Sequence, residues 1–211
     1  DLGTVVITDT ACETPMWDDR YNTPDYVFGE APCEWLVMNR YRLPTVGRAL
    51  AIGDGEGRNG VFLAECGLDV TRVDLSAVGL QKAAQLAAKR GVSITTVTSD
   101  LADFEIPNNH FDVIVAIYTH LPMPLRRDVH RRSVSGLKPD GLVILEAFHK
   151  EQPKYTSGGP KTADLLYSID ELKDDFSGLK LLDALEGLCY LNEGDRHQGL
   201  GHIVRLVAQN R

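Results

Sequence analysis

Residues 53–60, Gly53-Asp54-Gly55-Glu56-Gly57-Arg58-Asn59-Gly60, stand between a short apolar run at 48–52 and a helical pattern. Glycines allow the backbone to approach a ligand closely and to adopt conformations that other residues resist. The helix that follows presents unpaired N–H groups in its first turn. Gly55, Gly57 and Gly60 also fit the G-x-G-x-x-G pattern of dinucleotide-binding folds. The loop therefore indicates a nucleotide-type ligand without identifying it, and a purely structural turn is the alternative.

On both sides of this loop, strand and helix patterns alternate as far as residue 147. Ser76 is a suitable N-cap for the second helix, and Gly91 ends it. Such alternation predicts an α/β fold with a doubly wound, mostly parallel, seven-stranded sheet of Rossmann-like type. The expected strands are 48–52, 68–73, 94–98, 111–117 and 142–147, and the expected helices follow the glycine loop, Ser76 and Pro124.

The last third of the chain has a different pattern. Residues 148–168 contain prolines and glycines without periodicity, which is typical of a functional or mobile connection. A short helix is expected at 170–176, and strands are expected at 179–191 and 202–208. The joint at 192–195 is too short for a helical crossover, so these two strands should form an antiparallel hairpin.

The composition narrows the class of function. The chain has 211 residues, 22 Lys and Arg against 30 Asp and Glu, and a formal net charge of -8. An acidic chain of this size predicts one domain, 1–211, with no nucleic-acid partner. The basic run at 126–132 is interpreted as the solvated face of a helix. No apolar run is long enough for a membrane span, and the four scattered cysteines predict a cytoplasmic protein without a metal site.

Three further motifs accompany the glycine loop in a fixed order. Asp74 ends the second strand, where a carboxylate can accept both ribose hydroxyls of an adenosine. Residues 99–104 (Ser-Asp-Leu-Ala-Asp-Phe) follow the third strand, 111–114 (Phe-Asp-Val-Ile) open the fourth, and 137–141 (Leu-Lys-Pro-Asp-Gly) precede the fifth. In this order and spacing the chain resembles the class I methyltransferases, as does a parallel sheet that ends in an antiparallel hairpin.

The resemblance implies S-adenosylmethionine as the cofactor and S-adenosylhomocysteine as the product. Trp17-Asp18-Asp19-Arg20-Tyr21, the Gly57-Arg58-Asn59 step and the short chain are most similar to the tellurite-resistance and small-molecule methyltransferases. The cofactor-binding residues that the resemblance implies are Gly53, Asp54, Gly55, Glu56, Gly57, Asn59, Asp74, Leu75, Asp100, Leu101, Ala116, Trp17 and Tyr21.

One position departs from the family pattern. The family usually has an acid two positions before the first glycine, and this chain has Ala51. The methionyl ammonium of the cofactor needs a counter-charge, because burying an unpaired charge is costly. We hypothesise that Glu56 or Asp54 supplies it.

The acceptor should lie beyond the carboxyl ends of the strands, where open α/β sheets bind ligands. Tyr118 and His120 follow the fourth strand, and Arg196 and His197 lie in the C-terminal joint. Their positions make all four candidates for the acceptor site. In the tellurite-type relatives that the chain resembles, basic residues late in the chain face the acceptor, and Arg196-His197 is the nearest match. The alternative for each histidine is a packed polar residue. Methyl transfer is an in-line displacement that depends mainly on orientation, so the expected substrate is a small molecule, such as a thiol or a chalcogen oxyanion.

These expectations divide the chain into an N-terminal lid or helical segment (1–47), a cofactor-binding core (48–147) and an acceptor-side loop with the hairpin (148–211). The expected assembly is a monomer or a homodimer. Three alternatives remain: a non-catalytic S-adenosylmethionine-binding regulator, an NAD-dependent oxidoreductase that uses the same glycine loop, and a methyltransferase that acts on protein or RNA. The acidic charge argues against RNA.

Overall fold

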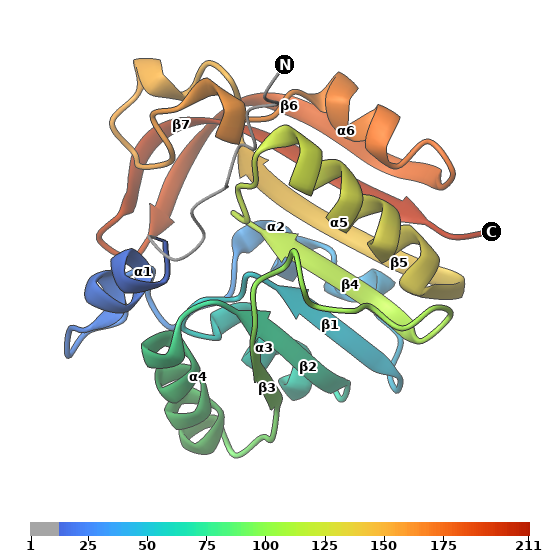
Figure 1. Cartoon of the computed structure of the whole chain (residues 1–211), viewed down its shortest axis with the longest axis horizontal. Helices are drawn as coiled ribbons and strands as arrows, with labels where there is room; N and C mark the ends of the chain where they lie inside the picture. Colours follow the sequence, from blue (N-terminus) through green and yellow to red (C-terminus); the bar gives the residue numbers. More distant parts are fainter. Residues whose placement is uncertain (1–12) are drawn as a thin grey trace, which may run out of the picture.

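The chain folds around one seven-stranded sheet in the order β3-β2-β1-β4-β5-β7-β6 (Figure 1). The computed structural model describes residues 13–211. Strands β1 to β5 are parallel, β7 is antiparallel to β5, and β6 is antiparallel to β7. The strands are Arg48–Ile52 (β1), Asp69–Asp74 (β2), Thr95–Thr98 (β3), Phe111–Ile117 (β4), Leu137–Phe148 (β5), Lys180–Glu193 (β6) and His197–Gln209 (β7). The predicted fold class and the terminal hairpin are confirmed.

Helices cover both faces of this sheet (Figure 1). In β1, Ala49 and Ala51 pack with residues of α2 and α3 on one face, whereas Leu50 and Ile52 join the core under α5 and α6. All four are buried, as expected for a parallel strand that is covered on both sides. The α-helices are Glu13–Tyr21 (α1), Glu34–Met38 (α2), Arg58–Glu65 (α3), Ala77–Arg90 (α4), Met123–Gly136 (α5) and Ile169–Asp175 (α6), and short 3₁₀ helices are Arg40–Arg42 (η2), Gln152–Lys154 (η3) and Ala163–Leu165 (η4).

Local signals set the ends of several helices. The Ser76 hydroxyl accepts a hydrogen bond from the Gly79 N–H at the start of α4, and Gly91 ends α4 in the left-handed conformation with φ 70°. Helix α6 begins with a capping box in which Ser168 and Glu171 bond each other's backbone. These contacts satisfy N–H groups that have no partner within a helix, so α4 and α6 begin at residues whose side chains can cap them.

Two expectations are corrected. Residues 138–141 were expected to form a turn before the fifth strand, but β5 already begins at Leu137 and its pairing with β4 is irregular there. Asp140 takes a left-handed conformation, φ 64°, which accommodates this irregularity within the strand. The connection at 148–168 was expected to lack structure, but it contains η3 and η4.

The basic run on α5 is only partly solvated, so the interpretation as a solvated face was wrong for two of its members. Arg126 is 1% exposed and His130 is 4% exposed. Both bond the carboxylate of Asp175 at the end of α6, each at 2.8 Å. This carboxylate neutralises the charge that α5 brings to the core, and therefore joins α5 to α6.

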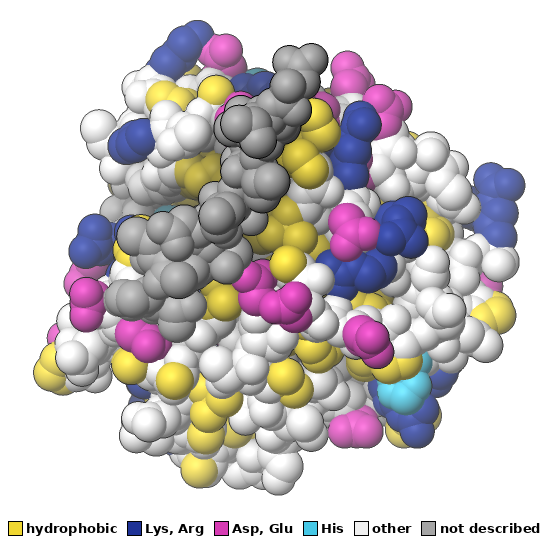
Figure 2. All heavy atoms as spheres, viewed as in Figure 1, with side chains coloured by type: hydrophobic (Ala, Val, Ile, Leu, Met, Phe, Trp, Pro, Cys, Tyr) yellow, Lys and Arg dark blue, Asp and Glu magenta, His cyan; other side chains and the backbone are white. Residues whose placement is uncertain are grey.

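The surface contains both kinds of charge. On the face shown in Figure 2, acidic and basic side chains are interspersed and no single basic surface forms there. Within residues 13–211, no helix combines the length and the apolar character that crossing a membrane requires.

Candidate functional site

The glycine loop joins β1 to α3 at the point where the strand order reverses between β1 and β4. The Gly53 N–H donates to the carbonyl of Val73 at 2.8 Å, which holds the loop against β2. Gly53, Gly55 and Gly57 have φ values of 60°, 53° and 89°. A Cβ on Gly57 would lie 2.4 Å from the Cβ of Ala83 on α4. Glycine is therefore required here both by the backbone conformation and by the close approach of α4.

Asp74 lies at the carboxyl end of β2, directly beside this loop. Its Oδ2 accepts a hydrogen bond from the Gly55 N–H at 2.7 Å, and its Oδ1 accepts one from the Ser76 N–H at 2.9 Å. A carboxylate has about four acceptor positions, so two remain for ribose hydroxyls. The structure thus places Asp74 as predicted, with its orientation fixed by two backbone groups.

The exit of β3 lies next to Asp74, since the Ser99 N–H donates to the Asp74 carbonyl at 3.0 Å. Asp100 Oδ1 accepts from the Ala102 N–H at 2.8 Å. Arg132 on α5 donates to the carbonyl of Leu101 at 2.6 Å and so holds the segment that follows β3 against α5. The carboxyl ends of β1, β2 and β3 therefore bring the glycine loop, Asp74 and Asp100 together at one edge.

Three other predicted cofactor residues lie around this edge. Asn59 is 5% exposed, and its Oδ1 accepts from the Cys33 N–H at 2.9 Å, so it fastens the N-terminal segment to α3. Ala116 pairs with Ile52 between β4 and β1. Leu75 is half-buried between β2 and α4.

Asp54 lies under the glycine loop with a partner that the sequence pattern did not reveal. Arg72 on β2 is completely buried, donates to the Gly55 carbonyl at 2.6 Å and has its Nε 3.6 Å from Asp54 Oδ2. Asp54 also accepts the Gly60 N–H at the start of α3. Burial raises the pKa of Asp54 to about 6, and Arg72 and the Gly60 N–H only partly offset this effect.

Glu56 likewise has a protein partner. It forms an ion pair with Lys82 of α4, and its Oε2 accepts from the Val27 N–H at 2.9 Å. The Lys82 ammonium also donates to the carbonyls of Tyr21, Thr23 and Asp25, at 3.1, 3.2 and 2.7 Å. Both carboxylates proposed for the methionyl ammonium thus already have a cationic partner, and that role remains a hypothesis.

The raised pKa of Asp54 makes its contribution to stability depend on pH. The folded protein keeps the Asp54 proton up to about pH 6, whereas the unfolded chain loses it near pH 3.8. The contribution is therefore full below the lower value and decreases as the pH rises through the upper one. At about 1.4 kcal/mol per pKa unit, the decrease is at most about 3 kcal/mol.

We expect Asp54→Asn to abolish this dependence while keeping an oxygen for the Gly60 N–H. Urea unfolding from pH 4 to 7 should show the wild type losing stability relative to the variant. Asp69→Asn, at the exposed start of β2, is the control. A constant difference between wild type and Asp54→Asn would contradict the raised pKa.

The N-terminal segment covers the glycine loop. Trp17 stacks on Tyr21 with 5.6 Å between ring centroids, and a Cβ on Gly55 would lie 2.5 Å from the Tyr21 hydroxyl. Asp18 bonds the Ser76 hydroxyl at 2.5 Å and so fastens α1 to α4. Trp35, in contrast, is 4% exposed and packs in the core. Helix α1 thus lies over the glycine loop, whereas α2 is part of the core.

Tyr118 leaves β4 in a left-handed conformation, φ 52°, which is uncommon for a residue with a side chain. Its hydroxyl donates to Glu146 on β5, and Glu146 is also paired with Arg205 on β7. Burial, followed by the charge of Glu146, raises the pKa of Tyr118 well above its usual range. Tyr118 is therefore a neutral hydroxyl held in place, and Arg205 was not among the predicted site residues.

His120 has backbone partners on both ring nitrogens. Its Nδ1 lies 2.6 Å from the Leu165 carbonyl, and the Phe148 N–H donates to its Nε2 at 3.4 Å. Burial lowers its pKa to about 4. This arrangement favours a structural role in joining β5 to η4, which is the alternative noted for the histidines.

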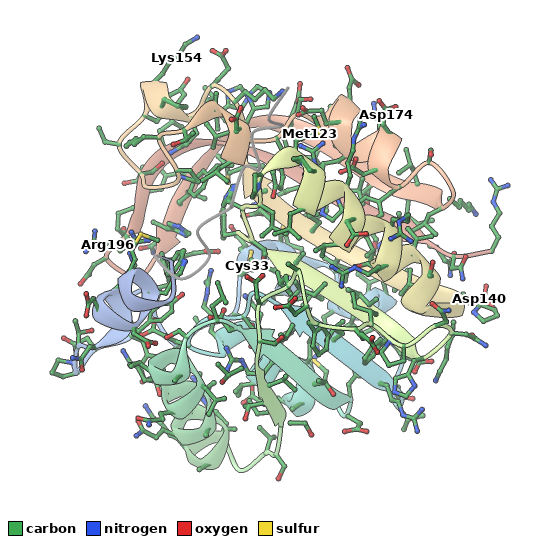
Figure 3. All side chains as sticks on the ribbon, in the orientation of Figure 1. Cys33, Met123, Asp140, Lys154, Asp174 and Arg196 are labelled. Carbon is green, nitrogen blue, oxygen red and sulfur yellow. The ribbon has the colours of Figure 1, made fainter. Side chains whose placement is uncertain are left out.

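His197 is buried at the start of β7, whereas Arg196 is exposed in the turn between β6 and β7 (Figure 3). The His197 ring is 4.4 Å from that of Tyr118, 4.7 Å from that of Phe28 and 5.1 Å from that of Phe148, centroid to centroid. Burial lowers the pKa of His197, with Glu193 acting in the opposite direction. Of the predicted catalytic residues, Tyr118 and His197 are thus in contact.

A cluster of potential metal ligands lies behind these rings. Cys33, Glu146 and Glu193 have ligand atoms within 4.8 Å of one another. Arginines compensate both carboxylates, since Glu146 pairs with Arg205 and Glu193 with Arg58. Burial raises the pKa of the Cys33 thiol well above its usual range. A protonated thiol and two paired carboxylates are a poor ligand set for a cation.

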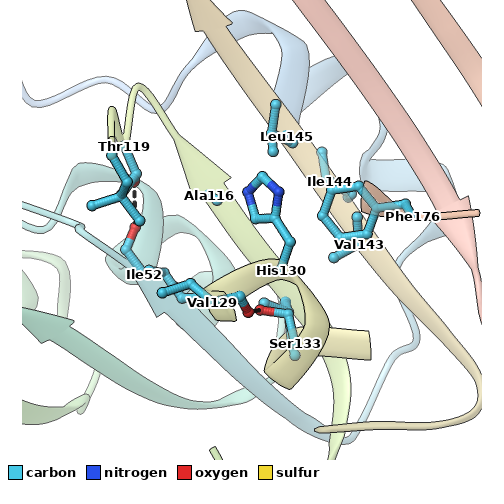
Figure 4. Close-up of a pocket in the computed structure, with 12 residues that line it drawn as sticks. Ile52, Ala116, Thr119, Val129, His130, Ser133, Val143, Ile144, Leu145 and Phe176 are labelled. Atoms are coloured by element: carbon cyan, nitrogen blue, oxygen red, sulfur yellow. Dashed lines mark hydrogen bonds between the residues drawn. The ribbon is translucent and has the colours of Figure 1, made fainter. Parts of the chain in front are cut away.

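A small cavity lies between β1, β4, β5 and α5, next to the ends of β1 and β4 (Figure 4). Its volume of about 10 Å³ suits one water molecule. His130 points toward it in Figure 4, and Thr119 bonds the Ile52 carbonyl at 2.8 Å beside it. A cavity of this size cannot hold a nucleotide, so it is not a candidate for the cofactor site.

Comparisons with known proteins show what this chain is similar to. A family model described as "Methyltransferase domain" matches residues 49–141. The uncharacterized methyltransferase YbaJ of Bacillus subtilis is 30% identical over 134 residues, which are 61% of this chain and 47% of that protein. The matched region thus spans less than half of that relative.

Two solved structures share the fold. TehB from Haemophilus influenzae has a TM-score of 0.72 and 19% identity over 94% of this chain and 67% of its own. The N-methyltransferase NodS from Bradyrhizobium japonicum, in complex with S-adenosylhomocysteine, also has a TM-score of 0.72, with 17% identity over 93% of this chain and 97% of its own. At this level of identity the two structures show the fold alone. The methyltransferase-domain family matches residues 49–141, the part of the chain that carries the glycine loop, Asp74 and Asp100 at three adjacent strand ends.

Proposed function

We propose that this protein transfers the methyl group of S-adenosylmethionine to a small-molecule acceptor. The observation that carries the proposal is the alignment of four adjacent strand ends. The glycine loop, Asp74 and Asp100 follow β1, β2 and β3, and Tyr118 follows β4. An adenosyl group held by the first three would place its sulfonium toward Tyr118, where an acceptor can approach in line.

The surroundings of His197 favour an acceptor that has a proton to lose. The rings of Phe28, Tyr118 and Phe148 pack around His197, which is 4% exposed. A neutral imidazole can take a proton from a thiol or an acidic hydroxyl. The nearby arginines, Arg58 and Arg205, are each paired with a glutamate, so their charges are already compensated. We therefore propose a thiol as the first acceptor class and a chalcogen oxyanion as the second.

Calorimetric titration tests the cofactor assignment. We expect S-adenosylmethionine and S-adenosylhomocysteine to bind with micromolar affinity and NADH to show no binding. Binding of NADH alone would overturn the proposal and indicate an oxidoreductase. Formation of S-adenosylhomocysteine with panels of thiols and of selenium and tellurium oxyanions would then identify the acceptor class.

A non-catalytic S-adenosylmethionine-binding protein is the second candidate. The contact between the rings of His197, Tyr118 and Phe148 favours it, because packed rings can block an acceptor. Tight binding of both adenosyl ligands without turnover on any acceptor panel would support this candidate.

We propose a monomer or homodimer in the cytoplasm. Cys33, Cys66 and Cys189 are free thiols in the structure, which supports a reducing compartment. The net charge of -8 supports a partner other than nucleic acid.

A further inference from the structure

We propose that Glu193, held by Arg58 of the glycine loop, is the positioning residue that orients His197 to take the proton of the acceptor. This inference rests on the proposed methyl transfer and adds to it a link between the cofactor loop and the acceptor side. Arg58 directly follows Gly57 and opens α3, whereas Glu193 and His197 lie 135 or more positions later, on either side of the hairpin turn.

The first contact in this link is a buried ion pair. Arg58 Nη2 lies 2.8 Å from Glu193 Oε2, and the two side chains are 8% and 10% exposed. Arg58 also donates to the Ala31 carbonyl at 3.3 Å, and Glu193 Oε1 accepts from the Glu34 N–H at 3.2 Å. A pair with these further hydrogen bonds holds both side chains in one geometry. Glu193 is therefore fixed from the glycine loop and from α2.

The second contact joins Glu193 to His197. The His197 Nδ1 is 3.7 Å from Glu193 Oε2. This nitrogen is buried and makes no hydrogen bond within the described part of the chain. A buried nitrogen without a partner is costly, and the nearest carboxylate can satisfy it after a small closure. Catalytic hydrogen bonds are often long in ligand-free enzymes and shorten when the site is filled.

This geometry assigns separate tasks to the two ring nitrogens. With Nδ1–H donating to Glu193, Nε2 remains as the proton acceptor. The acceptor X–H gives its proton to Nε2 while X forms a bond to the methyl carbon. The bond between that carbon and the sulfonium breaks, its electron pair stays on sulfur, and S-adenosylhomocysteine results. The imidazolium is stabilised by Glu193 until it returns the proton to water.

The charges that face His197 agree with this assignment. The side chains of Glu193 on β6, of Arg58 on α3, and of Tyr118 and His120 in the segment after β4 surround it. Burial acts to raise the pKa of Glu193, but the nearby His197 imidazole and the charge and hydrogen bond of Arg58 lower it to about 2. Glu193 thus remains a carboxylate at every pH at which His197 could titrate.

The test is an NMR titration of the imidazole nitrogens in the ¹⁵N-histidine-labelled full chain with S-adenosylhomocysteine bound. In the wild type, His197 should carry its proton on Nδ1. Glu193→Gln should lower the His197 pKa by about one unit, because it removes the negative charge that favours the imidazolium. Glu193→Asp should restore most of the shift. Glu186→Gln is the matched control, since Glu186 lies on the same strand and faces His149 at 3.3 Å.

The outcomes separate this inference from the proposed function. An unchanged His197 pKa and tautomer in folded Glu193→Gln would overturn the positioning role, whatever the activity. If Glu193→Gln does not fold, the tautomer of the wild type decides, because a His197 proton on Nε2 instead of Nδ1 would overturn the positioning role. If the NMR shifts occur but no acceptor is methylated, the positioning holds and the methyl-transfer proposal fails. Where an acceptor is found, the pH for half-maximal kcat should decrease together with the His197 pKa.

Discussion

Replacing Asp74 with asparagine is expected to weaken the binding of S-adenosylmethionine and S-adenosylhomocysteine by at least about 10- to 100-fold. A hydrogen bond to a charged group contributes about 1.5–3 kcal/mol, and the ribose hydroxyls would lose a charged acceptor. Asparagine also offers one oxygen where the carboxylate offers two, so either the Gly55 N–H or the Ser76 N–H loses its partner. The glycine loop would then be held less rigidly, and the site would bind ribose less tightly.

Calorimetry on both ligands, with urea unfolding on the same samples, measures this effect. Asp69→Asn is the matched control, because Asp69 starts the same strand at the exposed end that is remote from the loop. The control should bind as the wild type does. An Asp74→Asn variant that folds and binds both ligands with wild-type affinity would show that the ribose lies elsewhere.

The strand ends could be predicted because their signals are local. Asp74 ends an alternating strand and is followed by the N-cap Ser76, and the glycines at 53, 55 and 57 mark a loop that only they can form. The antiparallel hairpin followed from the length of the joint at 192–195. Such features depend on a few neighbouring residues, so sequence periodicity and turn chemistry are sufficient to find them.

The charges beneath the site could not be found in this way, because their partners are distant in sequence. Lys82 occupies a helical position that suits a solvated lysine, yet it bonds four groups of the loop and the N-terminal segment. In the sequence, Glu193 looks like a turn residue. The structure shows that Arg58, 135 positions earlier, lies beside it. Arg72 was missed as well, although a charge within a covered parallel strand requires a buried partner and could have served as a signal.

Arg72, Lys82 and Arg58 have a common effect on the site. Each is a buried cation paired with a carboxylate: Arg72 with Asp54, Lys82 with Glu56, and Arg58 with Glu193. These pairs tie the glycine loop to β2, to α4 with the N-terminal segment, and to the hairpin. Burying both members of a pair costs desolvation, so their value lies more in fixing geometry than in stability.

Gly57→Ala is expected to destabilise the fold by about 3 kcal/mol and to abolish measurable cofactor binding. The left-handed backbone, φ 89°, costs about 1–2 kcal/mol for alanine. The new methyl group would lie 2.4 Å from the Cβ and 2.8 Å from the Cα of Ala83, within helix α4. An overpacked core contact of this kind costs about 1–3 kcal/mol, and relieving it would displace the loop that holds the adenosyl group.

Gly91→Ala separates the cost of the left-handed backbone from the cost of the contact with Ala83. Gly91 is also left-handed, φ 70°, but no described heavy atom lies within 4 Å of its added Cβ. The substitution should therefore lower the free energy of unfolding by only about 1 kcal/mol, from the backbone conformation alone, and leave cofactor binding unchanged. Urea unfolding and calorimetry on both variants test the comparison. Equal losses of stability would mean that α4 yields to the new methyl group, and the close approach of Gly57 to Ala83 would then have no part in holding the cofactor loop.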